Sequence, residues 1–259
     1  MNHYKNFKSE CEGNIAKQGG DQSLLKVRNV FLNESFAHKY PYNFEFLGRP
    51  IVQYPQDMVA VQELIWEIKP DLIIETGIAH GGSLIMSASM LALLDMCEAI
   101  ESGITLDPKQ STRKVLGLDI DIRSHNLDAI DAHPMSSRIQ MIQGSSIAPN
   151  VINQVWALAK SHKCIMVFLD SNHTHDHVLA ELEAYASLVT KDSYCIVFDT
   201  IVEDLPAELS GDRPWGPGNN PKTAVWEYLK LHPEFEIDKD IHNKLLITVA
   251  PDGYLRRLY

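Results

Sequence analysis

The segment ETGIAHGGS stands between an apolar run and a helical pattern, and it contains a glutamate, glycines and a serine of the kinds that bind charged ligands. Glycines let backbone N–H groups approach a ligand, and the start of a helix carries a partial positive charge. The spacing differs from the G-x-G-x-x-G dinucleotide motif and from a phosphate loop that ends in G-K-S/T. A carboxylate here would repel a pyrophosphate and attract a cationic amino group. We therefore predict a cofactor site for an amine at Glu75, Gly77, Gly81 and Ser83, with an ordinary strand–helix turn as the alternative.

Asp119 ends the next apolar run along the chain. In nucleotide-binding α/β sheets, an acidic side chain at this place accepts hydrogen bonds from the ribose hydroxyls. Asp121 follows two residues later, so both carboxylates are candidates. A site for a cationic amine beside a site for a ribose indicates a nucleoside with an amino-acid tail, which is S-adenosylmethionine. Ser145, after the third strand, is then predicted to border the adenine.

Two further aspartates, Asp170 and Asp199, end two successive predicted strands. Carboxylates at neighbouring strand ends can share a hard divalent cation such as Mg²⁺. His173 stands three residues after Asp170, and we predict catalytic roles for both of these residues. His175 and His177 are interpreted as capping or solvated residues at the start of a helix.

The three alternating histidines suggest a zinc or iron site as an alternative to magnesium. A site of two histidines and one carboxylate usually combines a His-x-Asp/Glu motif with a distant histidine. The only His-x-Glu of the chain, at residues 232–234, follows a helix and is interpreted as a surface turn. Magnesium is therefore favoured.

An arginine and a tryptophan stand in the rigid stretch RPWGPGNNP. A segment rich in proline and glycine that leads straight into ordered chain is more typical of a working loop than of a linker. We predict that residues 200–220 form a substrate loop, with Arg213 and Trp215 contacting the substrate. The alternative is a packed loop in which Trp215 fills the core.

Repeated strand–helix units position these residues. Continuous apolar runs, each followed by a helical pattern, are typical of buried parallel strands and imply a doubly wound α/β sheet with right-handed crossovers. The predicted strands are 72–76, 115–120, 139–142, 165–170 and 194–199, and two late strands at 235–238 and 245–249 predict an antiparallel edge. Residues 1–50 show weak periodicity and are predicted to be an N-terminal extension that packs on the main domain of residues 51–259.

Length and composition are those of a globular chain, with 259 residues, 45% hydrophobic and 22% charged. The net charge of −11 argues against a nucleic acid or an anionic membrane as the main partner. No apolar run reaches about 18 residues, so no membrane-spanning helix is expected. The N-terminal residues lack an apolar signal core and the four cysteines form no C-x-x-C pair, so we expect a cytoplasmic location.

The segments that carry these residues resemble the cephalosporin hydroxylase family. The resemblance covers roughly residues 45–257 and rests on the motifs E-x-G-x-x-x-G-G-S, GLDID, LDSNH and RPWGPGNNP. Despite its name, that family has the class I methyltransferase fold and is similar to magnesium-dependent sugar O-methyltransferases. The resemblance therefore implies a Rossmann-like, mostly parallel sheet of seven strands with an antiparallel edge.

The resemblance also implies a role for each candidate residue. S-adenosylmethionine would be bound by Glu75, Gly77 and Asp119, with Ser145 near the adenine. Asp170 and Asp199 would bind Mg²⁺, and His173 would be the general base.

One position departs from the pattern that the resemblance implies. An acidic residue often precedes the second aspartate in that pattern, whereas this chain has Phe198. The metal site is therefore expected to be weaker, to recruit a further ligand, or to be lost. The candidates for a further ligand are Asn172, Glu203 and Asp204.

We hypothesise that the protein transfers a methyl group from S-adenosylmethionine to a hydroxyl of a sugar or glycosylated metabolite, and that it forms a homo-oligomer. One alternative is an iron-dependent hydroxylase, as the family's name suggests. Another is an inactive cofactor-binding scaffold in a biosynthetic complex, which the presence of Phe198 keeps open. A nicotinamide oxidoreductase is disfavoured by the spacing of the glycines.

Overall fold

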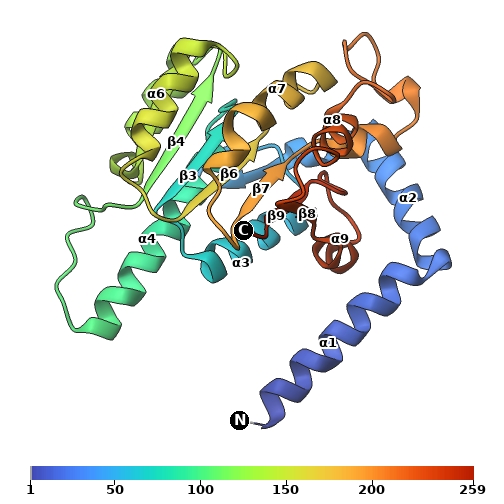
Figure 1. The fold of residues 1–259 in the computed structure, drawn as a ribbon, viewed down its shortest axis with the longest axis horizontal. Helices are drawn as coiled ribbons and strands as arrows, with labels where there is room; N and C mark the ends of the chain where they lie inside the picture. Colours follow the sequence, from blue (N-terminus) through green and yellow to red (C-terminus); the bar gives the residue numbers. More distant parts are fainter. Residues whose placement is uncertain (1) are drawn as a thin grey trace.

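Seven strands form the main sheet of the computed structural model, which describes residues 2–259 (Figure 1). Strands β5, β4, β3, β6 and β7 are parallel in that order, and β9 then lies antiparallel to both β7 and β8. This confirms the doubly wound, mostly parallel sheet with an antiparallel edge. The strands are β3 (Leu72–Thr76), β4 (Lys114–Asp119), β5 (Ile139–Gln143), β6 (Ile165–Leu169), β7 (Tyr194–Val197), β8 (Phe235–Ile237) and β9 (Tyr254–Arg257).

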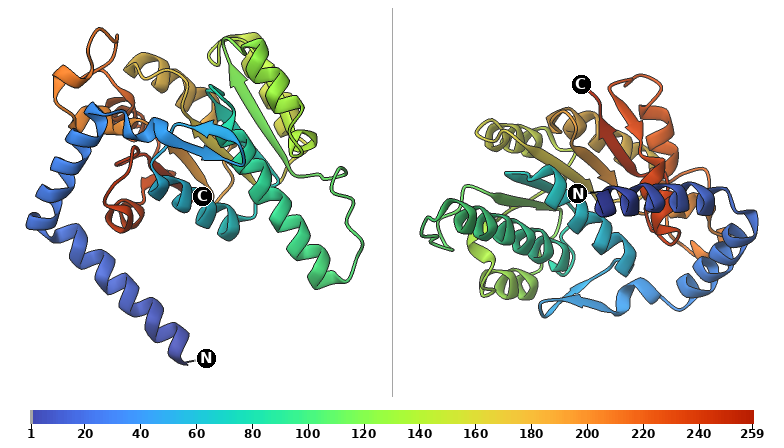
Figure 2. Two further views of the ribbon diagram at one scale, coloured as in Figure 1. Left: turned by 180° about the vertical axis from the view of Figure 1, so that it is seen from behind. Right: turned by 90° about the horizontal axis from the view of Figure 1, so that it is seen from below.

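Helices cover both faces of the sheet because its central strands are apolar on both sides. Every residue of β3, β6 and β7 is buried. One face packs against α3 (Pro55–Ile68), α4 (Gly82–Ser102), α5 (Ser124–Asp131) and α9 (Lys239–Leu245), and the other packs against α6 (Pro149–Ala159), α7 (His175–Tyr185) and α8 (Pro221–Tyr228) (Figures 1 and 2). The strand order reverses between β3 and β6, which is the place where open α/β sheets bind ligands at the carboxyl ends of their strands.

Two helices, α1 (Asn2–Gly20) and α2 (Gln22–Ala37), precede the sheet. α1 extends away from the sheet (Figure 2), and Gln18 near its end donates a hydrogen bond of 2.6 Å to the Asn243 carbonyl oxygen of α9. The weak periodicity of this segment did not reveal α1, because most of its side chains are exposed and no apolar stripe is required.

A short hairpin connects the N-terminal helices to the sheet. It follows the 3₁₀ turn η1 (Tyr40–Asn43) and consists of β1 (Phe44–Phe46) and β2 (Arg49–Ile51). The hairpin crosses residue 50, where the sequence predicts the domain boundary. The remaining 3₁₀ turns are η2 (Ser136–Arg138), η3 (Ala186–Leu188), η4 (Thr200–Asp204) and η5 (Ala207–Leu209).

The strand predicted at residues 245–249 is wrong. α9 ends at residue 245, and the last strand is β9. The apolar run after α9 is a loop in which Thr248 and Val249 are buried: the Val249 N–H donates to Asp57 Oδ2 of α3 at 2.9 Å, and the Thr248 hydroxyl donates to Asp57 Oδ1. A buried carboxylate thus takes the hydrogen bonds that a neighbouring strand would otherwise provide.

The helix α4 is long and apolar enough, by length and composition, to cross a membrane. The sequence pattern predicts no membrane-spanning helix. In this fold α4 is a core helix: Leu84, Ile85 and Leu91 are fully buried, and half of its most apolar stretch is buried. Asp95 of the same helix accepts hydrogen bonds from Arg113 and Arg138.

Candidate active site

Gly77 places the turn after β3 directly against the end of β6. Its φ of +89° lies in the left-handed region, and its N–H donates to the Leu118 carbonyl oxygen at 2.7 Å. A Cβ on Gly77 would lie 2.1 Å from the Asp170 carbonyl oxygen, so a larger residue would push the two strand ends apart. The predicted cofactor turn and the predicted metal ligand Asp170 are therefore held together by their backbones.

Glu75 is buried at the end of β3 with one carboxylate oxygen unpaired. Ser83 Oγ, in the first turn of α4, donates to Glu75 Oε1, whereas Oε2 has no hydrogen-bond partner among residues 2–259. Burial raises the pKa of Glu75 to about 7, although the Ser83 hydrogen bond opposes this shift. A cationic amino group at Oε2 would satisfy that oxygen, so the turn fits the amino-acid end of S-adenosylmethionine.

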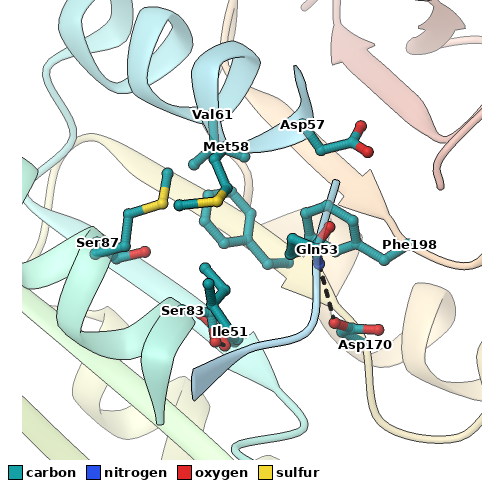
Figure 3. A pocket seen from close by; sticks show the side chains of 12 residues that line it. Ile51, Gln53, Asp57, Met58, Val61, Ser83, Ser87, Asp170 and Phe198 are labelled. Carbon is teal, nitrogen blue, oxygen red and sulfur yellow. Dashed lines mark hydrogen bonds between the residues drawn. The ribbon is translucent and has the colours of Figure 1, made fainter. Parts of the chain in front are cut away.

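Two neighbouring hollows open beside this turn. One, of about 330 Å³, runs along the backbone of residues 77–80 and 82–83. The other, of about 360 Å³, is lined by equal numbers of apolar and polar side chains, with Glu75 among the polar ones (Figure 3). Both are lined by Ile51, Gln53, Ser83 and Asp170.

Asp119 shapes the loop that follows β3. Its Oδ2 accepts the N–H groups of Ile78 at 2.8 Å and Ala79 at 3.3 Å, and its Oδ1 accepts the Asp121 N–H at 3.0 Å. Asp121 itself is exposed, with Arg123 3.8 Å away. Of the two predicted ribose ligands, Asp119 lines a hollow of the site and Asp121 does not line it. The carboxylate oxygens of Asp119 keep lone pairs that can accept further hydrogen bonds.

A third hollow, of about 430 Å³, brings Asp119 together with Ser145. It is lined by Gly77, Leu118, Asp119, Ile120, Ser145, Ser146, Ser171, Asn172 and His177. His177, interpreted from the sequence as a capping or solvated residue, lies 3.0 Å from Ser146 Oγ in this wall. No local sequence signal distinguishes it from His175, whose Nδ1 contacts Thr223 Oγ1 at 2.8 Å.

Gly81 is the one predicted cofactor residue that lines none of these three hollows. It precedes α4 with a φ of +82°, and a Cβ there would lie 2.4 Å from Ile130 Cδ1. The packing of the turn on α5 accounts for this glycine.

Asp170, His173 and Asp199 converge at the carboxyl ends of β6 and β7. One potential ligand atom from each lies within 4.8 Å of the other two, and His173 Nε2 is 3.2 Å from Asp199 Oδ2. Asp199 has a φ of +54°, an uncommon conformation that aspartate tolerates better than most residues. The two carboxylates fit a divalent cation that takes oxygen ligands.

Asp170 is surrounded by other acidic groups. Burial and the carboxylates of Asp199, Glu75 and Glu181 raise its pKa well above the usual range. Gln53, which is 6% exposed, donates from Nε2 to Asp170 Oδ2 at 3.3 Å (Figure 3). A bound cation would relieve this repulsion. Gln53 was not predicted, because it lies 117 residues from its partner.

Phe198 lines the cavity of Figure 3, and its ring meets Phe168 edge to face with 6.2 Å between the ring centroids. The three residues that the sequence offered as further ligands are engaged elsewhere. Asn172 accepts hydrogen bonds from Thr174, Glu203 accepts from Gly218 and Asn220, and Asp204 pairs with Lys222.

The largest of these hollows, about 990 Å³, lies on the other side of the cluster. His173 and Asp199 form part of its wall, together with Arg213 and Trp215 of the predicted loop. Trp215 meets His173 edge to face at 4.9 Å, so it lies at the site and not in the core. The opposite wall comes from the N-terminal segment, with Phe36, Ala37, Lys39, Pro41 and Tyr42, which the sequence did not indicate.

The His-x-Glu motif at 232–234 lies outside these hollows. His232 stacks on Tyr228 at 3.8 Å, and its Nδ1 lies 3.0 Å from Glu234 Oε1. Within the described chain, the metal-ligating cluster contains one histidine and two carboxylates. This set differs from the two histidines and one carboxylate of the iron-dependent alternative.

Comparisons with known proteins show the family to which this chain belongs. The model of the family described as Rhamnosyl O-methyltransferase/CmcI matches residues 38–258. Rhamnosyl O-methyltransferase of Mycobacterium tuberculosis is 30% identical over 206 residues, which cover 78% of this chain and 73% of that protein. The Mycobacterium leprae protein of the same name is 28% identical over 228 residues, covering 85% and 88%.

A solved structure shares the fold. The apo-structure of CmcI-N160 aligns with a TM-score of 0.52 at 18% sequence identity, and the alignment covers 84% of this chain and 77% of that one. The fold is that of the class I methyltransferases. The chain belongs to the Rhamnosyl O-methyltransferase/CmcI family, the family that its motifs resemble.

Proposed function

We propose that this protein transfers the methyl group of S-adenosylmethionine to a hydroxyl oxygen of a sugar, with the help of a divalent cation. The position of Asp170 carries this proposal. Asp170 lines the hollow beside the Gly77 turn and also belongs to the cluster whose other members, His173 and Asp199, border the 990 Å³ hollow. The names of the mycobacterial relatives, rhamnosyl O-methyltransferases, support a sugar as the acceptor.

The side chains divide the work between two ligands. Glu75 Oε2 would receive the ammonium group of the cofactor, while Asp119 and Ser145, which line one hollow, would bind its ribose and border its adenine. Asp170 and Asp199 would hold the cation, whose positive charge would lower the pKa of the acceptor hydroxyl so that its proton is released to solvent. Holding that oxygen against the methyl group provides much of the rate enhancement, because positioning removes the entropic cost of the encounter.

Hydrogen bonds with Glu203 and Asn220 hold the loop that carries Trp215. Glu203 accepts the Gly218 N–H at 2.7 Å, and Asn220 Nδ2 donates to the Gly216 carbonyl oxygen at 2.9 Å. Arg213 lies over the Trp215 ring at 5.8 Å. We infer that this loop covers the sugar and keeps water away from the reacting atoms.

Calorimetric titration with S-adenosylmethionine and its demethylated product tests the cofactor half of the proposal. We expect both nucleotides to bind. The acceptor half is tested with methyl-labelled cofactor and a simple rhamnoside, where label should appear in the sugar only when a divalent cation is present. Folded protein that binds neither nucleotide would exclude a methyltransferase. Binding without transfer to any glycoside would favour the inactive scaffold.

Replacing Trp215 with alanine should raise the KM for the sugar acceptor about three- to tenfold, because the lost ring contact is worth roughly 0.5–1.5 kcal/mol. The affinity for S-adenosylmethionine should not change, since Trp215 does not line the cofactor hollows. Steady-state kinetics with the rhamnoside measures both effects. Trp226→Ala is the matched control, because Trp226 is half-exposed on α8 and outside the hollow. An unchanged KM in Trp215→Ala would remove this residue from acceptor binding.

Homo-oligomer formation and a cytoplasmic location stay predictions from the sequence.

A further inference from the structure

A nitrogen of His173 lies beside both carboxylates of the cluster. This nitrogen lies within 4.8 Å of a carboxylate oxygen of both Asp170 and Asp199. Phe198 offers no ligand atom, so within residues 2–259 the histidine is the third donor of the cluster. The set is thus one imidazole nitrogen and two carboxylates.

We propose that His173 is the third ligand of the divalent cation, and that the site therefore binds Mn²⁺ more tightly than Mg²⁺. Mg²⁺ takes oxygen ligands almost exclusively, whereas imidazole suits first-row transition metals and carboxylates suit Mn²⁺ as well as Mg²⁺. The inference rests on the proposed function only in that both invoke the same cation. It changes the role of His173, because a nitrogen that binds a cation cannot accept a proton at the same time.

Neighbouring side chains contact two of the three donors, as outer partners of metal ligands usually do. Gln53 Nε2 donates to Asp170 Oδ2 at 3.3 Å, which orients that carboxylate. The Trp215 ring meets His173 edge to face with an interplanar angle of 86°, and the His173 side chain is 18% exposed. The imidazole therefore contacts both the Trp215 ring and Asp199.

Mn²⁺ provides a direct readout that does not depend on activity. Protein stripped with a chelator is titrated separately with Mn²⁺ and Mg²⁺ by calorimetry, and the Mn²⁺ complex is examined by pulsed electron paramagnetic resonance. We expect Mn²⁺ to bind more tightly than Mg²⁺, because an imidazole ligand suits first-row transition metals. We also expect a ¹⁴N coupling from a directly bound imidazole nitrogen.

Three variants show which residue supplies that nitrogen. His173→Gln should remove the ¹⁴N coupling and weaken Mn²⁺ binding by at least about tenfold, with a smaller effect on Mg²⁺. His173→Asp should restore cation binding and shift the preference toward Mg²⁺. His175→Gln is the control, because His175 pairs with Thr223 and Glu227 outside the cluster, and it should change neither affinity nor spectrum. Circular dichroism of each variant verifies folding.

The possible results separate this inference from the proposed function. Absence of ¹⁴N coupling in wild-type protein, wild-type Mn²⁺ affinity in His173→Gln, or no binding of either cation would each overturn the ligand role of His173. If S-adenosylmethionine binds and methyl transfer occurs without the coupling, the proposed function stands and only this inference fails. If the coupling appears in a protein that binds no S-adenosylmethionine, the metal site stands and the methyltransferase fails.

Discussion

Asp170→Asn is expected to lower methyl transfer by about 10²-fold or more, the range seen when one preorganised electrostatic group is removed. Asparagine keeps the shape of the side chain but loses the negative charge that holds the cation. The same substitution should not destabilise the fold. The acidic groups around Asp170 raise its pKa, so its ionised form is disfavoured and the neutral amide relieves the repulsion. Kinetics and thermal melting in a chelator measure both effects.

Thermal melting with an added cation tests whether Asp170 binds that cation. The melting temperature of wild-type protein should rise with Mg²⁺ or Mn²⁺, because a ligand that binds only the folded state stabilises it, and that of Asp170→Asn should rise less. Asp121→Asn serves as the control, since Asp121 is an exposed carboxylate at another strand end. Turnover close to the wild-type value in Asp170→Asn would remove this carboxylate from the reaction.

The affinity for S-adenosylmethionine is expected to rise roughly tenfold between pH 6 and pH 7.5, because Glu75 must lose its proton to receive the ammonium group. Burial raises the pKa of Glu75 to about 7 in the unliganded protein, so ionisation takes place within this interval. Above about pH 8 the affinity should fall again as the amino group of the ligand loses its charge. Calorimetry across this pH range measures the profile.

Glu75→Gln should abolish the rising part of the profile and weaken binding at pH 7.5 by about 10- to 100-fold, the range for a hydrogen bond to a charged group. Asp121→Asn again serves as the control and should leave the profile unchanged. A profile in Glu75→Gln that matches the wild type would place the ammonium group elsewhere.

The stability of the unliganded protein provides an independent check on Glu75. The pKa of this residue is higher in the folded state than its ordinary value of 4.5, so the folded protein holds a proton that the unfolded chain loses. The free energy of unfolding therefore falls as the pH rises from 4.5 to about 7, by on the order of 3 kcal/mol. The Glu75→Gln variant has no carboxylate to ionise, so its free energy of unfolding should not fall over this pH range. Urea unfolding at pH 8 should therefore show this variant to be more stable than the wild type.

The sequence alone determined the sheet and most of the strand-end residues. Buried parallel strands are apolar on both faces, so β3, β6 and β7 stand out as continuous apolar runs. The carboxyl ends of such strands meet at one edge of a sheet. For this reason, Asp170 and Asp199 could be placed together before their separation was known.

The tertiary structure decided what lies around those strand ends. Gln53 and Asp57 bind partners 117 and more than 190 residues away, and no local pattern reports a contact between such distant residues. The same reason explains the wrong strand at 245–249: an apolar run indicates a segment that packs on the core, but not which group accepts the hydrogen bonds of its backbone.

The same limit applies to His173 and to the hollow beside it. Spacing placed this histidine near Asp170, but only the fold turns its nitrogen toward Asp199 while Phe198 packs against Phe168. Only the fold brings α2 and η1 across from the loop that carries Trp215. Residue types determine which chemistry is available, whereas the directions of side chains from separate elements, set by packing, determine which atoms meet.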